Sequence, residues 1–148
     1  MNVTWTLGFP SGHEAGEYLT MDLGGTKLRT CWITLKGRRE DTEVNQNIYH
    51  LPAEIKTGTA DQLWDYIADA LQDFIKQQRL GGTSEEPLPL GFTFSYPAHQ
   101  DYVDHGILQT WTKGFDIKGV EGEDVAQQLR DAMAKRVSLI LSSQADHN

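Results

Sequence analysis

The sequence has a single cysteine, Cys31, so no disulfide can form within the chain. This suits a reducing compartment, and we expect a cytoplasmic protein. No stretch approaches the ~20 consecutive apolar residues that a membrane span needs. Residues 1–10 lack the basic and apolar regions of a signal peptide. These absences disfavour a secreted or membrane-embedded protein.

Positive charge is also scarce, with 13 Lys and Arg against 21 Asp and Glu, which gives a formal net charge of −8. Because an acidic surface repels phosphate backbones, nucleic-acid binding is disfavoured. The five histidines show no i, i+4 pairing and no cysteine partner, so we expect no zinc site. The Walker A, dinucleotide-binding and G-x-S-x-G patterns are absent as well.

The remaining composition describes one globular domain. A chain of 148 residues can bury roughly two-thirds of the surface that it exposes when unfolded. Strands are predicted at residues 17–21, 28–35, 43–51 and 88–94, with a short strand or frayed tail at 137–141, and helices at residues 59–80 and 123–136. The first helix opens on a capping-box pattern, Thr59 with Gln62. This order predicts an α/β domain with a mixed sheet and the element sequence βββαβαβ.

A carboxylate, two glycines and a hydroxyl lie in the first predicted turn, in the segment Asp22-Leu23-Gly24-Gly25-Thr26. In such a turn backbone N–H groups can approach phosphate oxygens, and a hydroxyl can add a hydrogen bond. The carboxylate can hold Mg²⁺ through water. The same residues also fit an ordinary Gly-Gly hairpin, so the motif alone leaves both interpretations open.

Two further loops combine polar groups with aromatic rings. Ser95-Tyr96-Pro97 follows the strand at 88–94, and Thr112-Lys113 lies between Trp111 and Phe115. Hydroxyl and ammonium groups beside an aromatic surface suit the hydrogen bonding of a polyol such as a sugar. The alternatives are a strand end that simply turns and a basic loop packed by its own aromatic residues.

Together these segments resemble the hexokinase family of ATP-dependent sugar kinases, in particular its fungal glucokinase-like branch. The similarity covers roughly residues 9–136. Its motifs are FPSG (9–12), DLGGT (22–26), KTGTA (56–60), LPLGFTFSYPA (88–98), GILQ-WTKGFDI (106–117) and GVEGEDV (119–125). The resemblance implies the small N-terminal lobe of a hexokinase, with the actin-like ATPase fold of the ribonuclease H type.

The resemblance also implies roles for individual residues, with ATP, Mg²⁺ and glucose or another hexose as ligands. ATP phosphate contacts fall on Asp22, Gly24, Gly25, Thr26, Lys27 and Arg29, with Asp22 also holding Mg²⁺ through water. Sugar contacts fall on Ser95, Tyr96, Pro97, Thr112 and Lys113. Lys27 stands where the family usually has Asn, so a flexible cation replaces an amide beside the phosphates.

The larger departure from the family lies after residue 136. There the family continues into a strand with an Asn-Asp-Thr motif, whose Asp takes the proton from the sugar 6-hydroxyl. Residues 137–148 read VSLILSSQADHN and lack that motif. We therefore expect residues 1–136 to be an incomplete small lobe, and residues 137–148 to be a divergent strand and tail without a catalytic base.

Two functions follow from the resemblance. The first is ATP-dependent phosphorylation of glucose or other hexoses at the 6-hydroxyl, which is the first step of glycolysis. In that case we expect this chain to be a catalytically incomplete fragment that is inactive or nearly inactive by itself. The alternative is a non-enzymatic, hexokinase-like sugar-binding or regulatory module, including one that associates with an intact kinase.

Overall fold

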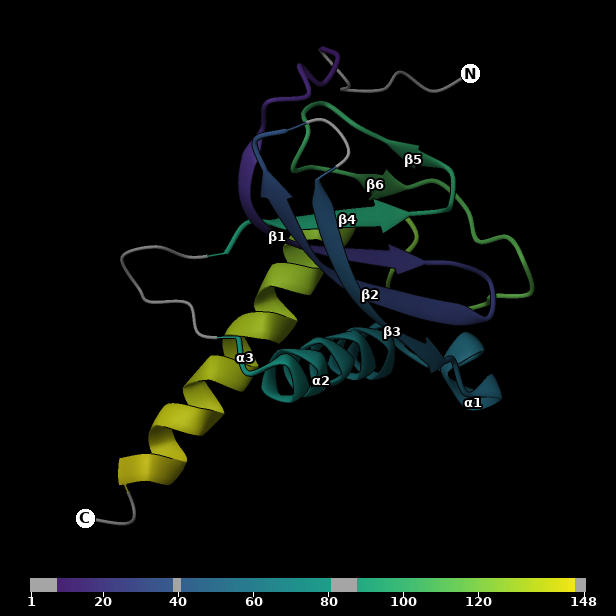
Figure 1. The fold of residues 1–148 in the computed structure, drawn as a ribbon. Helices are drawn as coiled ribbons and strands as arrows, with labels where there is room; N and C mark the ends of the chain where they lie inside the picture. Colours follow the sequence, from purple (N-terminus) through teal and green to yellow (C-terminus); the bar gives the residue numbers. More distant parts are fainter. Residues whose placement is uncertain (1–7, 39–40, 81–87, 146–148) are drawn as a thin grey trace. The chain divides into compact units, whose positions relative to one another are not determined.

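The computed structural model describes residues 8–38, 41–80 and 88–145 (Figure 1). These residues form two compact units. The sheet unit contains the described residues up to Leu51 together with Asp73–Ser95, and the helix unit contains Pro52–Gln72 and the chain from Tyr96 onward. The long helix at Ala60–Gln78 contributes turns to both units.

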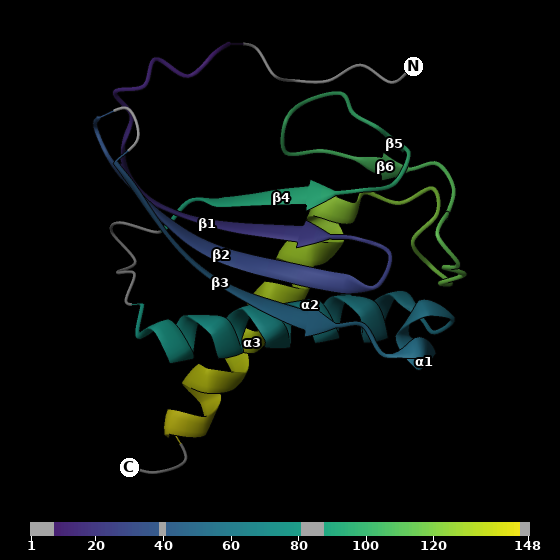
Figure 2. The same ribbon diagram turned by 45° about the vertical axis from the view of Figure 1, so that its right-hand side comes forward.

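The sheet unit is built on four strands in the spatial order β3-β2-β1-β4. They are β1 (Ala15–Leu23), β2 (Lys27–Lys36), β3 (Thr42–His50) and β4 (Leu90–Phe94). β2 runs antiparallel to both β1 and β3, whereas β4 runs parallel to β1 (Figure 2). A parallel pair needs a long crossover, and the chain between β3 and β4 supplies one. The four predicted strands and the mixed sheet are confirmed, at slightly different boundaries.

Alternate side chains of the central strands are buried. On β1 these are Leu19, Met21 and Leu23, and on β2 they include Leu28 and Thr30. A period of two places the members of each set on one face of the sheet. Thr30 is completely buried, and among the described residues its hydroxyl has no hydrogen-bond partner. Such a hydroxyl lowers stability, because its desolvation is not offset by a hydrogen bond.

Thr30→Val is expected to stabilise the chain by about 1 kcal/mol, because a methyl group of similar shape removes the unpaired hydroxyl. Urea unfolding followed by circular dichroism measures the change. Thr34→Val, on the same strand but only partly buried, serves as a control and is expected to stay within about 0.5 kcal/mol of the wild type. A clear loss of stability in Thr30→Val would show that the hydroxyl finds a partner in solution.

Helix α2 (Ala60–Gln78) begins with the predicted capping box. The Thr59 N–H donates to Gln62 Oε1 at 2.9 Å, and the Gln62 N–H donates to Thr59 Oγ1 at 3.4 Å. At the other end Arg79 adopts a left-handed conformation (φ 54°), and the Leu80 N–H donates to the Ile75 carbonyl at 3.0 Å. This is the Schellman arrangement, which satisfies carbonyls that a helix end leaves unpaired. The helix predicted at residues 59–80 is confirmed.

The helix unit also contains α1 (Ala53–Lys56), β5 (Ala98–His99), β6 (Ile107–Leu108) and α3 (Val125–Ala145). The sequence did not predict α1, β5 or β6. Arg136 joins α3 to α2, because its Nε donates to Asp69 Oδ1 at 2.6 Å and its Nη1 lies 3.3 Å from Asp65 Oδ1. The buried apolar side chains of this unit include Leu63, Trp64, Ile67, Leu108, Ile117, Val120, Val125 and Leu129. Among the described residues, no helix has the length and apolar character to cross a membrane.

The strand predicted at residues 137–141 is wrong, because α3 continues through these residues to Ala145. The sequence of α3, Val125–Ala145, contains no glycine or proline. Once a helix has formed, each further residue adds a hydrogen bond at little cost, so a helix runs on where no residue breaks it. Leucine is also a strong helix former, and two leucines lie among the five residues. The β-branched side chains that suggested a strand did not outweigh these effects.

Candidate functional site

The first predicted site is the turn between β1 and β2, formed by Gly24, Gly25 and Thr26. The Gly24 N–H donates a hydrogen bond to the Lys27 carbonyl at 3.0 Å, which closes the turn. Thr26 and Lys27 are exposed, and the two glycines are partly exposed. The turn therefore presents backbone, a hydroxyl and an ammonium group to solvent, which are groups that can bind a phosphate.

Asp22, at the end of β1, contacts residues from two different strands. Arg29 Nη1, on β2, lies 3.9 Å from Asp22 Oδ2. The hydroxyl of Ser95, directly after β4, donates to Asp22 Oδ1 at 3.4 Å. The Asp22 side chain remains 42% exposed, so its carboxylate is accessible to a ligand. The structure thus brings Ser95, a predicted sugar-site residue, and Arg29, a predicted phosphate-site residue, each against Asp22.

The sequence did not predict the contact between Asp22 and Ser95, although a signal for it was present. β1 and β4 are parallel, and the residue opposite Asp22 on β4 is Thr93. Polar residues that follow adjacent parallel strands meet at one edge of the sheet, where ligands of open α/β sheets commonly bind. The pairing of these two strands could not be read from either segment alone.

Gly24 is required neither by the backbone conformation nor by the packing of the turn. Its φ lies outside the left-handed region, and a Cβ added to it would come no closer than 3.5 Å to a neighbouring atom, the Lys27 carbonyl oxygen. A methyl group would therefore fit the folded chain. The space beside Gly24 is what a phosphate needs in order to approach the backbone of the turn closely.

Gly24→Ala is expected to change the free energy of unfolding by less than about 1 kcal/mol. The same methyl group is expected to weaken Mg-ATP binding by about tenfold, because it holds a phosphate away from backbone donors. NMR titration with Mg-ATP and urea unfolding measure the two effects. Gly91→Ala on β4, where a Cβ would meet Thr20 Cγ2 at 3.8 Å, is the matched control and should bind like the wild type. Equal affinities for Gly24→Ala and the wild type would contradict this role of the turn.

The second predicted site lies in a loop of the helix unit that is built around aromatic rings. The Trp111 ring stacks on Phe115 with centroids 5.2 Å apart, and it meets Tyr96 nearly perpendicularly at 4.9 Å. The Lys113 ammonium group lies over the Tyr96 ring, 4.8 Å from its centroid. Thr112, beside Lys113, is exposed. The loop thus joins two predicted sugar-site residues, Tyr96 and Lys113, in one cluster.

Tyr96 is itself buried, with 7% of its surface exposed. Burial raises the pKa of its hydroxyl well above the ordinary value, so the phenol stays neutral. The next residue, Pro97, accepts a hydrogen bond from the Gln109 N–H at 2.9 Å through its carbonyl oxygen. This bond ties the segment after β4 to the chain that leads into the Lys113 loop.

Two anchors of this loop were missed by sequence reasoning. The Trp111 backbone N–H donates to Glu121 Oε1 at 2.5 Å, and its indole N–H donates to the Ile117 carbonyl at 3.0 Å. Neither partner stands at a spacing that identifies it in the sequence. By unit, the predicted site residues divide into Asp22, Gly24, Gly25, Thr26, Lys27, Arg29 and Ser95 in the sheet unit, and Tyr96, Pro97, Thr112 and Lys113 in the helix unit.

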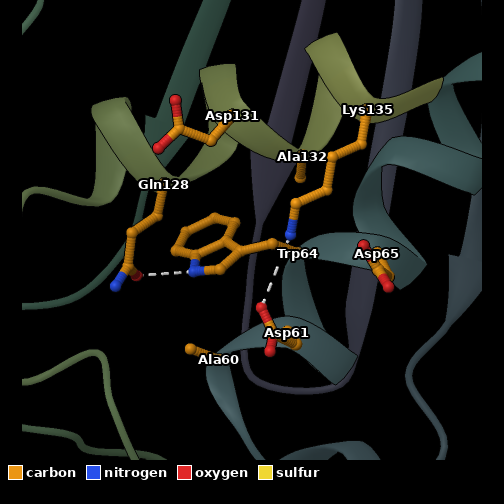
Figure 3. A pocket seen from close by; sticks show the side chains of 8 residues that line it. All are labelled: Ala60, Asp61, Trp64, Asp65, Gln128, Asp131, Ala132 and Lys135. Carbon is orange, nitrogen blue, oxygen red and sulfur yellow. Dashed lines mark hydrogen bonds and ion pairs between the residues drawn. The ribbon is translucent and has the colours of Figure 1, made fainter. Parts of the chain in front are cut away.

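A cavity of about 170 Å³ lies between α2 and α3 in the helix unit (Figure 3). Trp64 lines it and donates its indole N–H to Gln128 Oε1 at 2.6 Å. Across the cavity, Lys135 Nζ lies 3.7 Å from Asp61 Oδ1. None of the predicted site residues lines this cavity, and its polar groups hold the two helices together.

Known proteins match this chain over nearly its whole length. The sequence model of the family described as Hexokinase matches residues 1–143. A hexokinase of Emericella nidulans is 54% identical over 136 residues, which are 92% of this chain and 28% of that protein. Hexokinase-1 of Saccharomyces cerevisiae is 48% identical over 133 residues, 89% of this chain and 27% of that protein.

A solved structure is similar as well. The hexokinase from Schistosoma mansoni, complexed with glucose, aligns with a TM-score of 0.84 at 38% sequence identity, covering 92% of this chain and 30% of that one. The chain therefore spans between about a quarter and a third of the length of these relatives.

Proposed function

Because this chain belongs to the hexokinase family, we propose that it is the small-lobe part of a cytoplasmic enzyme that transfers the γ-phosphoryl group of ATP to the 6-hydroxyl of glucose or another hexose. The observation that carries the proposal is the convergence of Asp22, Arg29 and Ser95 at one edge of the sheet, after a parallel strand pair. The turn beside them has room for a phosphate at Gly24.

The β1–β2 turn is proposed to hold the phosphates of ATP. The backbone N–H groups of Gly25 and Thr26 and the Thr26 hydroxyl are the neutral donors, because the Gly24 N–H is bonded to the Lys27 carbonyl. The Arg29 guanidinium adds charged donors. Its side chain is half exposed, so a phosphate can reach it, and it lies near Asp22. Lys27 adds a second cation at the same turn. Donors from a turn, a guanidinium and an ammonium group together suit the several oxygens of a triphosphate.

The groups at Asp22 fit a hydrated Mg²⁺. One carboxylate oxygen accepts a hydrogen bond from Ser95, and the other faces Arg29 at 3.9 Å, which leaves the carboxylate both oriented and accessible. Mg²⁺ keeps several of its waters in protein sites, so a single carboxylate acting through water is sufficient. When bound, the ion offsets the negative charge of the phosphates during transfer. Asp22 is the residue proposed to hold it.

Sugar contacts are proposed for Ser95 in the sheet unit and for Tyr96, Pro97, Thr112 and Lys113 in the helix unit. The Thr112 hydroxyl can both donate and accept, and Lys113 donates only. Trp111 is bonded at both its backbone and its indole N–H, so the loop that carries these groups is braced before a sugar arrives. Bracing lowers the entropic cost of binding.

Catalysis needs more than these groups. Phosphoryl transfer requires alignment of the sugar hydroxyl with the γ-phosphate and a carboxylate that accepts the hydroxyl proton. The 148 residues do not contain the Asn-Asp-Thr motif that supplies this carboxylate in the family. Loss of an acid-base group alone lowers a rate by ~10²–10⁴. We therefore expect this chain alone to bind ligands rather than to turn them over.

NMR titration of the isotope-labelled chain tests the proposal. Mg-ATP is expected to shift the amide signals of residues 22–29, and D-glucose those of Ser95, Thr112 and Lys113. L-glucose, which has the same groups in mirror-image arrangement, is the control and should leave these signals in place. Shifts absent from both segments at saturating ligand, or equal shifts with the two glucose enantiomers, would overturn the assignment of the sites.

A further inference from the structure

We propose that Lys27 enables the β1–β2 turn to bind a row of linked phosphates without Mg²⁺, so that the protein binds both free ATP and inorganic tripolyphosphate. The inference rests on the phosphate site of the proposed function and adds a second class of ligand, the inorganic polyphosphates. It starts from the residue at which this sequence departs from the family in the turn, where Lys27 replaces the usual asparagine.

The first argument is the face of the sheet on which Lys27 lies. Along β2, Leu28 and Thr30 are buried, whereas Lys27 and Arg29 are exposed. Side chains alternate along a strand, so Lys27 and Arg29 project from the same face, with their Cα atoms about 7 Å apart. A triphosphate has three linked phosphoryl groups, so two cations at this spacing can contact different groups of one ligand.

The second argument is the balance of charge at the turn. Arg29 is paired in register with Asp22, and its Nη1 lies 3.9 Å from the carboxylate, which offsets the charge of the guanidinium. Lys27 makes no ion pair with any of the residues that the structure describes. Residues 22–29 therefore carry one carboxylate and two cations, a formal charge of +1 in a chain whose net charge is −8. With asparagine at residue 27 the same segment would be neutral, and its attraction for phosphates would be weaker.

The third argument is the backbone that carries the ammonium group. The Lys27 carbonyl accepts the Gly24 N–H at 3.0 Å, and the Thr26 carbonyl accepts the Leu51 N–H at 3.0 Å. Lys27 also pairs in register with His50 on β3. The backbone at residues 26 and 27 is thus tied to both neighbouring strands before a ligand arrives. Only the lysine side chain has to be ordered on binding, which keeps the entropic cost low.

The contribution of Lys27 is largest when Mg²⁺ is absent. A free triphosphate keeps all of its negative charge, and the Asp22 carboxylate at the edge of the turn then repels it. Lys27 offsets this repulsion, because its ammonium group is a compact charge with three donors that can contact any phosphate oxygen. These contacts are with phosphate oxygens and involve no part of the nucleoside. Inorganic tripolyphosphate should therefore bind at the turn as the phosphates of ATP do.

The test is an NMR titration of the isotope-labelled 148-residue chain with sodium tripolyphosphate in the presence of a chelator. The amide signals of residues 26–29 are expected to shift in the wild type. The affinity should fall about tenfold in Lys27→Asn and be kept in Lys27→Arg. For Mg-ATP the loss in Lys27→Asn should be only about two- to threefold, because the ion already offsets phosphate charge. Lys76→Asn, at an exposed lysine of α2, changes the net charge equally and should bind tripolyphosphate like the wild type.

The outcomes separate this inference from the proposed function. If tripolyphosphate leaves the signals of residues 26–29 of the wild type in place, the inference is wrong, whether or not the variants fold. Equal losses in Lys27→Asn and Lys76→Asn would reveal a general effect of net charge and overturn it as well. Binding of ATP but not of tripolyphosphate in the chelator would place the contact on the nucleoside, again against the inference. Tripolyphosphate binding that depends on Lys27, in a chain whose turn does not respond to Mg-ATP, would overturn the proposed function and leave the inference standing.

Discussion

Asp22→Asn is expected to weaken the binding of Mg-ATP by about 10- to 100-fold, the usual effect of changing a group that orients the shell of a metal ion. Asparagine keeps the shape of the side chain, and its amide oxygen can still accept the Ser95 hydroxyl. The fold should therefore survive, while the attraction to the hydrated ion is lost. Isothermal titration calorimetry or NMR titration measures the affinity.

Removal of Mg²⁺ should reverse the direction of this effect. With ATP and a chelator, Asp22→Asn is expected to bind more tightly than the wild type, because a negative charge that repels the phosphates has been removed. Asp41→Asn is the matched control, since Asp41 is an exposed carboxylate paired with Lys36 at 3.7 Å and lies outside the turn. Equal losses with and without Mg²⁺ would show that Asp22 acts on the fold of the turn and not on the ion.

Phe74→Ala is expected to cost about 3–5 kcal/mol of folding free energy. Phe74 lies in the C-terminal part of α2 that belongs to the sheet unit, and it is completely buried. Truncation to alanine leaves a cavity, because a densely packed core closes only partly around it. The free energy of unfolding of natural domains is only about 5–15 kcal/mol, so Phe74→Ala should remove a large part of the stability.

Guanidinium unfolding followed by tryptophan fluorescence measures this loss. The matched control is Lys76→Ala, on the same helix but exposed, which is expected to change stability by less than about 0.5 kcal/mol. A cost below about 1 kcal/mol for Phe74→Ala would mean that the sheet unit is loosely packed around α2.

Much of the fold could be predicted because local and tertiary preferences agree. The capping box at Thr59 and Gln62 fixes the start of α2, and apolar residues at helical spacing supply its buried side. The two strands β1 and β2 were predicted from short runs joined by a glycine turn, and in the structure their alternate side chains are buried. The similarity to solved hexokinases confirms the predicted fold class, the actin-like ATPase fold. The turn between β1 and β2 was predicted from adjacent glycines, a carboxylate and a hydroxyl, and its binding of phosphate stays a prediction.

The remaining features depend on contacts between distant segments. The Ser95 hydroxyl meets Asp22 only because β4 pairs with β1, and no local pattern specifies that pairing. The same holds for Lys113, whose ammonium group finds the Tyr96 ring across a loop. At residues 137–141 the error had the opposite cause, since local strand preference was given more weight than the continuation of α3. Short elements such as α1 are set by their surroundings and leave little trace in the sequence.

The rate of glucose 6-phosphate formation by the purified 148-residue chain tests the central claim most directly, namely that the chain carries binding groups of a hexokinase without its catalytic base. The assay contains Mg-ATP and D-glucose, with an intact hexokinase as positive control and circular dichroism to show that the chain is folded. We predict a rate equal to that of the enzyme-free blank. A rate above the blank that scales with chain concentration and falls in Asp22→Asn would contradict the claim and place a complete catalytic centre within these residues.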